Sequence, residues 1–477
     1  MDKFMSRRSF LKWGGMSAAA MMLGAAGALT LGKPGNALAS ALGGPTSGAG
    51  GYGPLVKDPG GVLNLPEGFQ YRIISEQGGK LSDGRVIPGM FDGMAAFQGP
   101  GRSTILVRNH EQSGNTSHPV EGRNPYDKTK TGGTTVLVVD ANRKIEREVV
   151  ASSGTTRNCA GGATPWGTWL TCEETGGGYV FEVDPLDPEN DLSKTPIREM
   201  GRFSHEATAL DPSTGIVYLT EDASPSFLYR FLPNDRSPKP GALRQGGKLQ
   251  AAKIEEMPLH QASALYTGQT YEILWVDVDP ERANADAAAK GCIQFSRLEG
   301  AYFAGGVFWF DDTSAGLTKL GRVYRYVPAT NTLELFYESS AANDLESPDN
   351  ICITPWGDLW IAEDGGGGGG DRIVGVTPEG ATYVFAENLL NGSELAGPTF
   401  SPDGGTFFVN IQSPGITFAI WGPFARRNAA RQRLMGHAAP PAPWAPAVSE
   451  GLAAFAARHG MSDLEAAALH RLGVPIL

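Results

Sequence analysis

The chain has 477 residues, with 51 acidic and 40 basic side chains, so its formal net charge at pH 7 is −11. A negative charge of this size argues against nucleic acid or an anionic membrane as a partner, because both would repel it. The 64 glycines, together with many short β-branched and aromatic runs, favour an all-β chain with tight turns.

Residues 1–39 have the form of a twin-arginine signal peptide. The segment Ser6-Arg-Arg-Ser-Phe-Leu-Lys12 precedes an apolar run from Gly14 to Leu31, and Ala37-Leu-Ala39 offers a small-residue cleavage site. A transmembrane anchor is the alternative, but the run is short and rich in glycine and alanine. We expect the twin-arginine export machinery as a partner and a periplasmic or secreted location. No later stretch is long and apolar enough for stable membrane insertion.

A strand–turn–strand pattern occurs six times in residues 40–424, and further strand-like pieces follow three of the copies. About four strands per copy is typical of a propeller blade, so we predict a six-bladed β-propeller with short helical insertions. A two-sheet sandwich is the alternative, but it would not explain why the copies keep equal phase. The copies begin at Asp92, Cys159, Glu206, Glu299 (a weak copy), Asp349 and Glu394.

Three unlike side chains that bind metals share one position in this repeat. Cys159, Glu206 and Asp349 each lie six residues before a proline, and the equivalent residue of the sixth copy is Ala396. In a radial repeat, equivalent positions converge on one place. A thiolate and two carboxylates are costly to hold together without cations, so we predict a metal site with these three as inner, catalytic residues.

In three copies an acid, Glu173, Glu221 or Glu363, lies six residues after the turn glycine, where a hairpin returns to the start of its first strand. Carboxylates suit calcium, magnesium or manganese, whereas a thiolate prefers iron or zinc, so the mixture indicates more than one kind of metal. The alternative is that these acids cap turns or line a wet channel. The predicted outer metal ligands are Glu111, Glu173, Glu221, Glu299 and Glu363.

The cysteines and histidines limit the kinds of metal site and catalytic mechanism that the sequence allows. A disulfide between Cys159 and Cys172 is an alternative to a metal-binding thiolate. His110 and His205 each precede an acid of the repeat, so they should pack between blades if those acids face the channel. Histidines are too few for a zinc hydrolase, and the absence of a G-x-S-x-G motif argues against covalent serine catalysis.

Two segments fall outside the repeat. The six glycines Gly365–Gly370 are expected to form a mobile loop at the propeller mouth. Residues 425–477 are predicted to be a Pro/Ala-rich linker and a helical tail, because Ser462-Asp-Leu-Glu465 is a capping box. The tail either clasps the propeller or binds a partner.

Five motifs occur in order along the repeats: Arg108–Glu111, Asn158–Glu174, Gly201–Ala207, Leu219–Ala223 and Ala396–Gly404. Together they resemble the PhoX-type alkaline phosphatases, over about Pro54 to Pro423. The resemblance implies a six-bladed propeller that holds ferric iron and calcium around a bridging oxo group. It also implies hydrolysis of small-molecule phosphate monoesters outside the cytoplasm.

In that family a cysteine and two glutamates hold the iron, which the resemblance carries over to Cys159, Glu206 and the shorter Asp349. The family arginine that contacts phosphate falls at Ser347, so another cation must bind the substrate. The candidates are Arg108, Arg157 and Arg202. The implied mechanism has no protein nucleophile: a metal-bound oxo or hydroxide attacks phosphorus in line at the propeller mouth.

Two other functions are alternatives. A metal-dependent hydrolase of another class, such as a lactonase, would use the same acids with calcium alone. A non-enzymatic binding propeller would hold its metals for structural reasons, and Ser347 in place of an arginine keeps that possibility open.

Overall fold

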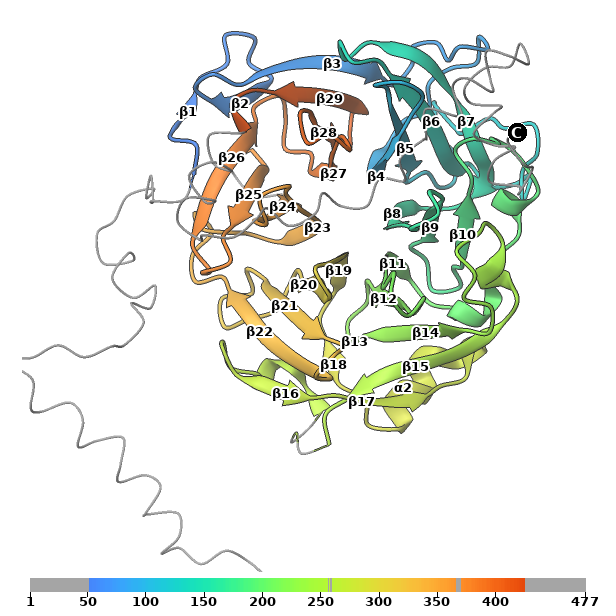
Figure 1. Ribbon diagram of the computed structural model, residues 1–477, viewed down its shortest axis with the longest axis vertical. Coiled ribbons are helices and arrows are strands. Elements are labelled where there is room, and N and C mark those ends of the chain that lie inside the picture. The colour runs from blue at the N-terminus through green and yellow to red at the C-terminus, as the bar shows by residue number, and fades with distance from the viewer. Residues whose placement is uncertain (1–50, 256, 258–259, 366–369, 425–477) are drawn as a thin grey trace, which may run out of the picture. The chain divides into compact units, whose positions relative to one another are not determined.

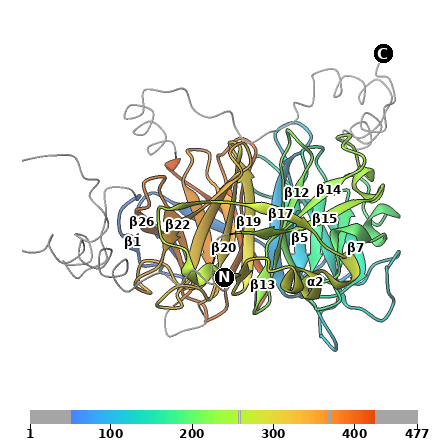
Figure 2. The same cartoon turned by 90° about the horizontal axis from the view of Figure 1, so that it is seen from below.

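The computed structural model describes residues 51–255, 257, 260–365 and 370–424. Six β-sheets stand around a central axis, so the predicted six-bladed β-propeller is confirmed (Figure 1). Seen from the side, the strands run between the two faces of the propeller (Figure 2). The signal peptide, the middle of the glycine run and the predicted C-terminal tail lie outside the described residues.

The first three blades follow one another along the chain, and the strands of every blade are named from the innermost outward. Blade 1 consists of β4 (Phe91–Gln98), β5 (Thr104–His110), β6 (Gly132–Val139) and β7 (Ile145–Thr155). Blade 2 consists of β8 (Asn158–Ala163), β9 (Trp169–Glu173) and β10 (Val180–Val183). Blade 3 consists of β11 (His205–Leu210), β12 (Val217–Glu221), β14 (Tyr229–Pro233), β15 (Gly247–Lys253) and β17 (Leu274–Asp277).

The other three blades include strands from distant parts of the chain. Blade 4 consists of β19 (Leu298–Ala304), β20 (Val307–Asp312), β21 (Arg322–Val327), β22 (Thr332–Glu338) and β16 (Thr270–Glu272). Blade 5 consists of β23 (Pro348–Ile353), β24 (Leu359–Glu363), β25 (Arg372–Val376), β26 (Thr382–Asn388), β2 (Leu63–Pro66) and β1 (Leu55–Val56). Blade 6 consists of β27 (Leu395–Phe400), β28 (Phe407–Ile411), β29 (Ile416–Trp421) and β3 (Gln70–Glu76).

Helices are few and short in the described residues. The predicted helical insertion contains α2 (Ala283–Ala289), preceded by the 3₁₀ turn η8 (Pro280–Arg282), whose N-cap Asp279 accepts a hydrogen bond from the backbone N–H of Glu281. A two-stranded pair, β13 (Ser226–Phe227) with β18 (Gln294–Phe295), joins this insertion to blade 3. The other 3₁₀ turns are η3 (Leu192–Lys194), η4 (Arg198–Met200), η5 (Ala242–Arg244) and η7 (Ala262–Ala264).

The N-terminal strands close the ring. β3 pairs antiparallel with β29 from Gln70 opposite Trp421 to Glu76 opposite Ile416, so the first part of the propeller supplies the outer strand of its last blade. β2 pairs with β26 in blade 5. These pairings tie blades 5 and 6 to the beginning of the chain and leave no open gap between the last blade and the first.

Aromatic side chains fill the spaces between blades. The fully buried Trp360 of blade 5 stacks on Phe385 at 4.1 Å between ring centroids and meets Phe407 of blade 6 edge-on at 4.8 Å. Between blades 3 and 4, Tyr218 stacks on Phe308 at 4.7 Å. Such pairs bury large apolar surfaces in defined geometries, so they fix how the inner strands of adjacent blades face each other.

Every inner strand is interrupted by a β-bulge at the same place. In β8 the register with β9 shifts between Asn158 and Gly161, and in β11 the register with β12 shifts between His205 and Thr208. Corresponding shifts occur in the inner strands of the other four blades. A bulge leaves its extra residue outside the ladder and turns the side chain in a new direction. The six bulges therefore aim one residue from each blade at a common place.

Adjacent bulges approach closely because small residues follow them. A Cβ atom on Gly300 of blade 4 would lie 2.1 Å from the carbonyl oxygen of Asp349 in blade 5. A Cβ atom on Gly93 of blade 1 would lie 2.7 Å from the carbonyl oxygen of Cys159 in blade 2. Glycine is required at these contacts, and it allows the bulges to form a tight ring.

Candidate metal centre

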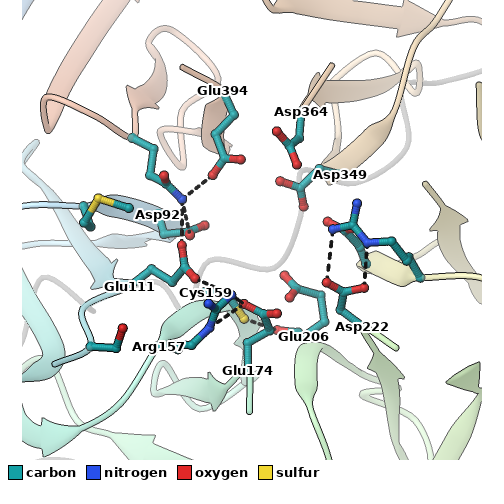
Figure 3. A pocket seen from close by; sticks show the side chains of 15 residues that line it. Asp92, Glu111, Arg157, Cys159, Glu174, Glu206, Asp222, Asp349, Asp364 and Glu394 are labelled. Atoms are coloured by element: carbon teal, nitrogen blue, oxygen red, sulfur yellow. Dashed lines mark hydrogen bonds and ion pairs between the residues drawn. The ribbon is translucent and has the colours of Figure 1, made fainter. Parts of the chain in front are cut away.

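A cavity of about 370 Å³ lies where the six bulges meet. Its lining contains nine carboxylates, one thiol and two arginines, and the labelled side chains converge on its centre in Figure 3. The carboxylates are those of Asp92, Glu111, Glu174, Glu206, Asp222, Glu299, Asp349, Asp364 and Glu394. The remaining lining residues are Met90, Ser113, Arg157, Cys159, Arg297 and Gln412.

The first repeat position in the lining is the bulge itself. Its residues are at most 5% exposed wherever they carry a thiol or a carboxylate. In blade 6 the bulge begins with Ala396, and the acid of that blade, Glu394, stands two positions earlier. The bulge residues in blade order are Asp92, Cys159, Glu206, Glu299, Asp349 and Ala396.

The second repeat position follows the second strand of each blade. Its backbone N–H donates a hydrogen bond to the carbonyl oxygen of the residue two positions before the bulge, as from Glu174 to Arg157 at 2.9 Å and from Asp364 to Ser347 at 3.0 Å. The bond recurs in all six blades, so it places these side chains beside the bulge residues. They are Glu111, Glu174, Asp222, Thr313, Asp364 and Gln412.

The third repeat position is the residue two places before the bulge. In four blades it adopts a left-handed backbone conformation, with φ of 52° at Met90, 48° at Arg157, 62° at Arg297 and 47° at Ser347. This conformation is uncommon for residues other than glycine and turns the chain into the bulge. Two of the four positions carry an arginine that lines the cavity.

Two groups of side chains are close enough to share a cation. The ligand atoms of Cys159, Glu174 and Glu206 all lie within 4.8 Å of one another, and so do those of Glu206, Glu299 and Asp349. One group contains a thiol and the other only oxygen donors. Glu206 belongs to both, so the two groups are adjacent and share a carboxylate. A donor set of one sulfur and several carboxylates fits a harder and a softer cation side by side.

Without cations these groups would retain protons. Burial, with added repulsion from Glu206, holds the pKa of the Cys159 thiol well above its usual range. Burial and the charge of Asp364 raise the pKa of Asp349 to about 7. Two like charges roughly 4 Å apart repel by about 4 kcal/mol at an effective dielectric constant of about 20. If all nine carboxylates were ionised, their summed repulsion would exceed a typical folding free energy of about 5–15 kcal/mol. The ionised cavity therefore requires cations.

The two arginines supply part of that charge. Arg157 forms an ion pair of 2.7 Å with Glu111 and hydrogen bonds to Glu174. Arg297 binds Asp222 through Nε at 2.9 Å and contacts Glu299 at 2.6 Å. Each arginine thus pairs with acids that also surround the candidate cation sites.

Two family models match this chain. The family model for alkaline phosphatase PhoX matches residues 50–151, 140–177 and 176–415. The chain belongs to the PhoX family. A model for the twin-arginine translocation signal matches residues 5–24, so the chain carries a signal for export to the periplasm or beyond. Within the described residues, no helix has the length and apolarity needed to cross a membrane.

A solved structure of a PhoX protein shows the same fold. Pseudomonas fluorescens PhoX, determined in complex with vanadate, a transition state analogue, superposes with a TM-score of 0.59 at 18% identity, over 76% of this chain and 96% of that one. A gluconolactonase from Xanthomonas campestris, XC5397, superposes with a TM-score of 0.40 at 13% identity, over 78% of this chain and 98% of that one. A sequence search of curated proteins finds no match.

In this PhoX-family chain, the residues predicted from sequence divide into two sets. Cys159, Glu206, Asp349, Glu111, Glu299 and Arg157 all line the cavity. Glu173, Glu221 and Glu363 do not, because the strand register turns them away. Asn158 pairs with Glu173, so Glu173 shares the face of Asn158, and the next residue, Glu174, shares the face of Cys159.

The acids that face away bond to the backbone of connecting loops. Glu173 accepts hydrogen bonds from the N–H groups of Thr156 at 3.0 Å and Tyr179 at 3.1 Å, and Glu221 accepts one from Phe227 at 3.0 Å. Glu363 accepts one from Glu346 and also binds Arg372. These three acids therefore lie outside the cavity lining and bond to the backbone of connecting loops.

Two of the predicted substrate-binding arginines also lie elsewhere. Arg108 is fully buried within blade 1, where it binds Glu148 at 2.8 Å and stacks on the ring of Phe91 at 3.5 Å. Arg202 is exposed and does not line the cavity.

The other sequence expectations about the site can also be compared with the structure. All four cysteines are free and buried, so the Cys159–Cys172 disulfide is not formed. His110 and His205 are buried away from the cavity; His110 binds the carbonyl of Gly89 and the hydroxyl of Thr135, and His205 stacks on Phe203. Burial lowers the pKa of His205 to about 4, and burial with the charge of Arg108 holds that of His110 well below its usual range, so both are neutral structural residues.

Sequence reasoning missed several lining residues of this PhoX-family site, and a signal for most of them was present. Three of them directly follow acids that were predicted as metal ligands, in the pairs Glu173-Glu174, Glu221-Asp222 and Glu363-Asp364. Arg297 precedes Glu299 by two residues, as Arg157 precedes Cys159. The missed residues are Met90, Asp92, Ser113, Glu174, Asp222, Arg297, Asp364, Glu394 and Gln412.

Proposed function

We propose that this PhoX-family protein is an exported, metal-dependent phosphatase that hydrolyses phosphate monoesters in the central cavity. The observation that carries the proposal is the convergence of nine carboxylates, a thiol and two arginines in one cavity of a PhoX-family propeller. Cations held by the acids would attract a phosphate dianion into a cavity that repels it when metal-free.

We assign ferric iron to the group that contains the thiol, Cys159, Glu174 and Glu206, and calcium to the all-oxygen group, Glu206, Glu299 and Asp349. Thiolate favours iron, and carboxylate oxygens alone favour calcium. The family resemblance joins Asp349 to Cys159 as an iron ligand. The geometry favours Glu174 as the nearer partner of the thiol, with Asp349 on the other side of Glu206.

Bound metals would supply positive charge for the phosphoryl oxygens and activate the attacking oxygen. The chain's own residues do the rest. Arg157, fixed by Glu111 and Glu174, faces the cavity and can bind a phosphoryl oxygen. The proposed reaction needs no protein nucleophile, because a bound metal would activate the attacking oxygen. The Cys159 thiol, which donates to the carbonyl oxygens of His205 and Glu206, would have to lose its proton to bind a metal as a thiolate.

The test is hydrolysis of a general aryl phosphate by the exported protein, with metal analysis of the same sample. We expect bound iron, turnover that depends on calcium, and inhibition by vanadate, the ligand of the related Pseudomonas protein. Cys159→Ala should lose iron and turnover together, whereas Cys352→Ala, a buried thiol outside the cavity, should keep both. Full iron and full activity in Cys159→Ala would refute the ligand assignment.

The all-oxygen group favours a second candidate, a hydrolase that uses calcium alone, such as a lactonase. This function needs no thiolate, so it would leave the protein without iron and with Cys159→Ala active. Iron content thus decides between the two. Tightly bound metals with no turnover of either ester class would favour the non-enzymatic binding propeller.

A further inference from the structure

Two arginines are the only positively charged side chains among the described residues that line the cavity. Arg157 and Arg297 occupy the same repeat position in blades 2 and 4, with φ of 48° and 62°. Their backbone N–H groups make equivalent bonds to the preceding blade, from Arg157 to the carbonyl of Gln112 and from Arg297 to that of Ala223, both at 2.9 Å. The fold therefore directs one arginine into the cavity in the same way from each of the two blades that flank blade 3.

Both arginines are held in place and still have N–H groups to offer. Each uses Nε and Nη2 for its carboxylate partners, and in each case Nη1 makes no hydrogen bond or ion pair to the described part of the protein. Their side chains are 42% and 37% exposed, whereas the lining acids are buried or half-buried. A guanidinium fixed by carboxylates on one edge and open on the other is a preorganised ligand for a phosphoryl oxygen.

The other blades offer no such group. The same repeat position holds Met90, Ser204, Ser347 and Glu394 in blades 1, 3, 5 and 6. Arg157 neighbours the thiol group of ligands through Glu174, and Arg297 neighbours the all-oxygen group through Glu299. Glu206, which belongs to both groups, projects from the blade between them.

We propose that Arg297 is a substrate-binding residue, which holds the phosphoryl oxygens together with Arg157 from the two sides of Glu206. This inference rests on the proposed phosphatase function and specifies its substrate site. A purely structural role, in which Arg297 only neutralises Asp222 and Glu299, is the competing explanation.

The test is Arg297→Gln in the metal-loaded protein, with Arg325→Gln as the matched control. Arg325 also belongs to blade 4, is 35% exposed and binds Glu334 through Nε and Nη2, but it does not line the cavity. Loss of a hydrogen bond to a charged group weakens binding by about ten- to a hundredfold. We expect Arg297→Gln to raise KM for an aryl phosphate and Kd for inorganic phosphate by this factor with unchanged metal content, and Arg325→Gln to leave both constants unaltered.

Calorimetric binding of inorganic phosphate separates this inference from the proposed function, because it needs no turnover. A wild-type protein that hydrolyses nothing, yet binds phosphate through Arg297, would refute the function and support the inference. Metal-loaded Arg297→Gln with wild-type KM and phosphate Kd would overturn the inference. If Arg297→Gln loses metal, Arg297→Lys keeps the charge beside Glu299, and wild-type phosphate affinity in the loaded Arg297→Lys protein would likewise overturn it.

Discussion

The backbone N–H of Glu174 donates a 2.9 Å hydrogen bond to the carbonyl oxygen of Arg157, two residues before the bulge that presents Cys159. The equivalent bond joins Asp222 to Ser204, Thr313 to Arg297 and the corresponding pairs of the other blades. One backbone contact thus brings together the three repeat positions that supply nearly the whole cavity lining. The chemistry of the site depends on which side chains occupy these positions.

Mutation of the adjacent acids Glu173 and Glu174 should have different effects, on stability in the first case and on metal content in the second. Glu174→Gln removes a ligand-type oxygen within 4.8 Å of the Cys159 and Glu206 ligand atoms, so iron content and activity should fall while the fold persists. Glu173→Gln weakens two backbone hydrogen bonds, so it should destabilise the protein by about 1–3 kcal/mol and leave metal content intact. Metal analysis and denaturant unfolding of both variants check this. Equal metal loss in the two variants would contradict the assignment of their faces.

The blade arrangement and the inner positions were accessible from sequence, because the proline and glycine turns mark each hairpin and the bulge keeps a constant distance from them. That distance brought Cys159, Glu206 and Asp349 into one phase. Glu173, Glu221 and Glu363 were predicted one residue too early, since turn spacing alone does not reveal that Asn158 pairs with Glu173, whereas Glu111 was predicted at the right position. The sequence pattern does not mark Arg297, because the fourth copy lacks the proline that marks the turn in the others.

Asn109 should stabilise the bulge that carries Cys159. Its side-chain amide donates to the carbonyl oxygens of Cys159 at 3.0 Å and Ala160 at 2.7 Å, and its oxygen accepts from Trp169 and Thr171. Asn109→Asp removes both donors and buries a carboxylate, so the free energy of unfolding should fall by about 3–5 kcal/mol. Thr220→Val removes the hydroxyl that donates to the carbonyl of Glu299 in the next blade and accepts from the N–H of Ala207, but it buries no charge, so it should cost less, about 1–3 kcal/mol. Chemical denaturation measures both, and equal losses would argue against a specific role for Asn109.

Stability should depend on pH in opposite directions with and without metals. Burial and the charge of Asp364 raise the pKa of Asp349 to about 7, and burial with repulsion from Glu111 raises that of Glu174 to about 7. Unfolded carboxyl groups titrate near pH 4, so the protonated acids stabilise the metal-free fold fully below about pH 4. This contribution is lost as the pH rises through 7.

In the loaded protein, protons compete with cations, so metal retention and the stability it provides should increase with pH. Thermal unfolding between pH 5 and pH 8 should therefore show Tm falling with pH after chelation and rising with pH when iron and calcium are present. Parallel curves for the two preparations would show that these carboxyls do not hold the cations.

Because the two ligand groups share only Glu206, mutation of any other member should affect one group alone. Asp349 belongs only to the all-oxygen group, so Asp349→Asn should lower calcium content and leave iron bound at Cys159. Glu206 belongs to both groups, so Glu206→Gln should lower both metals, and each loss should remove turnover because the substrate is clamped by the two sites together. Glu363→Gln, in the same blade as Asp349 but facing away from the cavity, is the control and should retain both metals.

Metal stoichiometry of the three purified variants decides between the alternatives. Loss of iron from Asp349→Asn would place Asp349 beside the thiol, as the family resemblance has it, and would contradict the assignment of Glu174 as the third iron ligand. Retention of either metal at full occupancy in Glu206→Gln would show that the two cations do not share this carboxylate. A single bridging acid between a thiolate site and an oxygen site predicts that only Glu206 couples the two affinities.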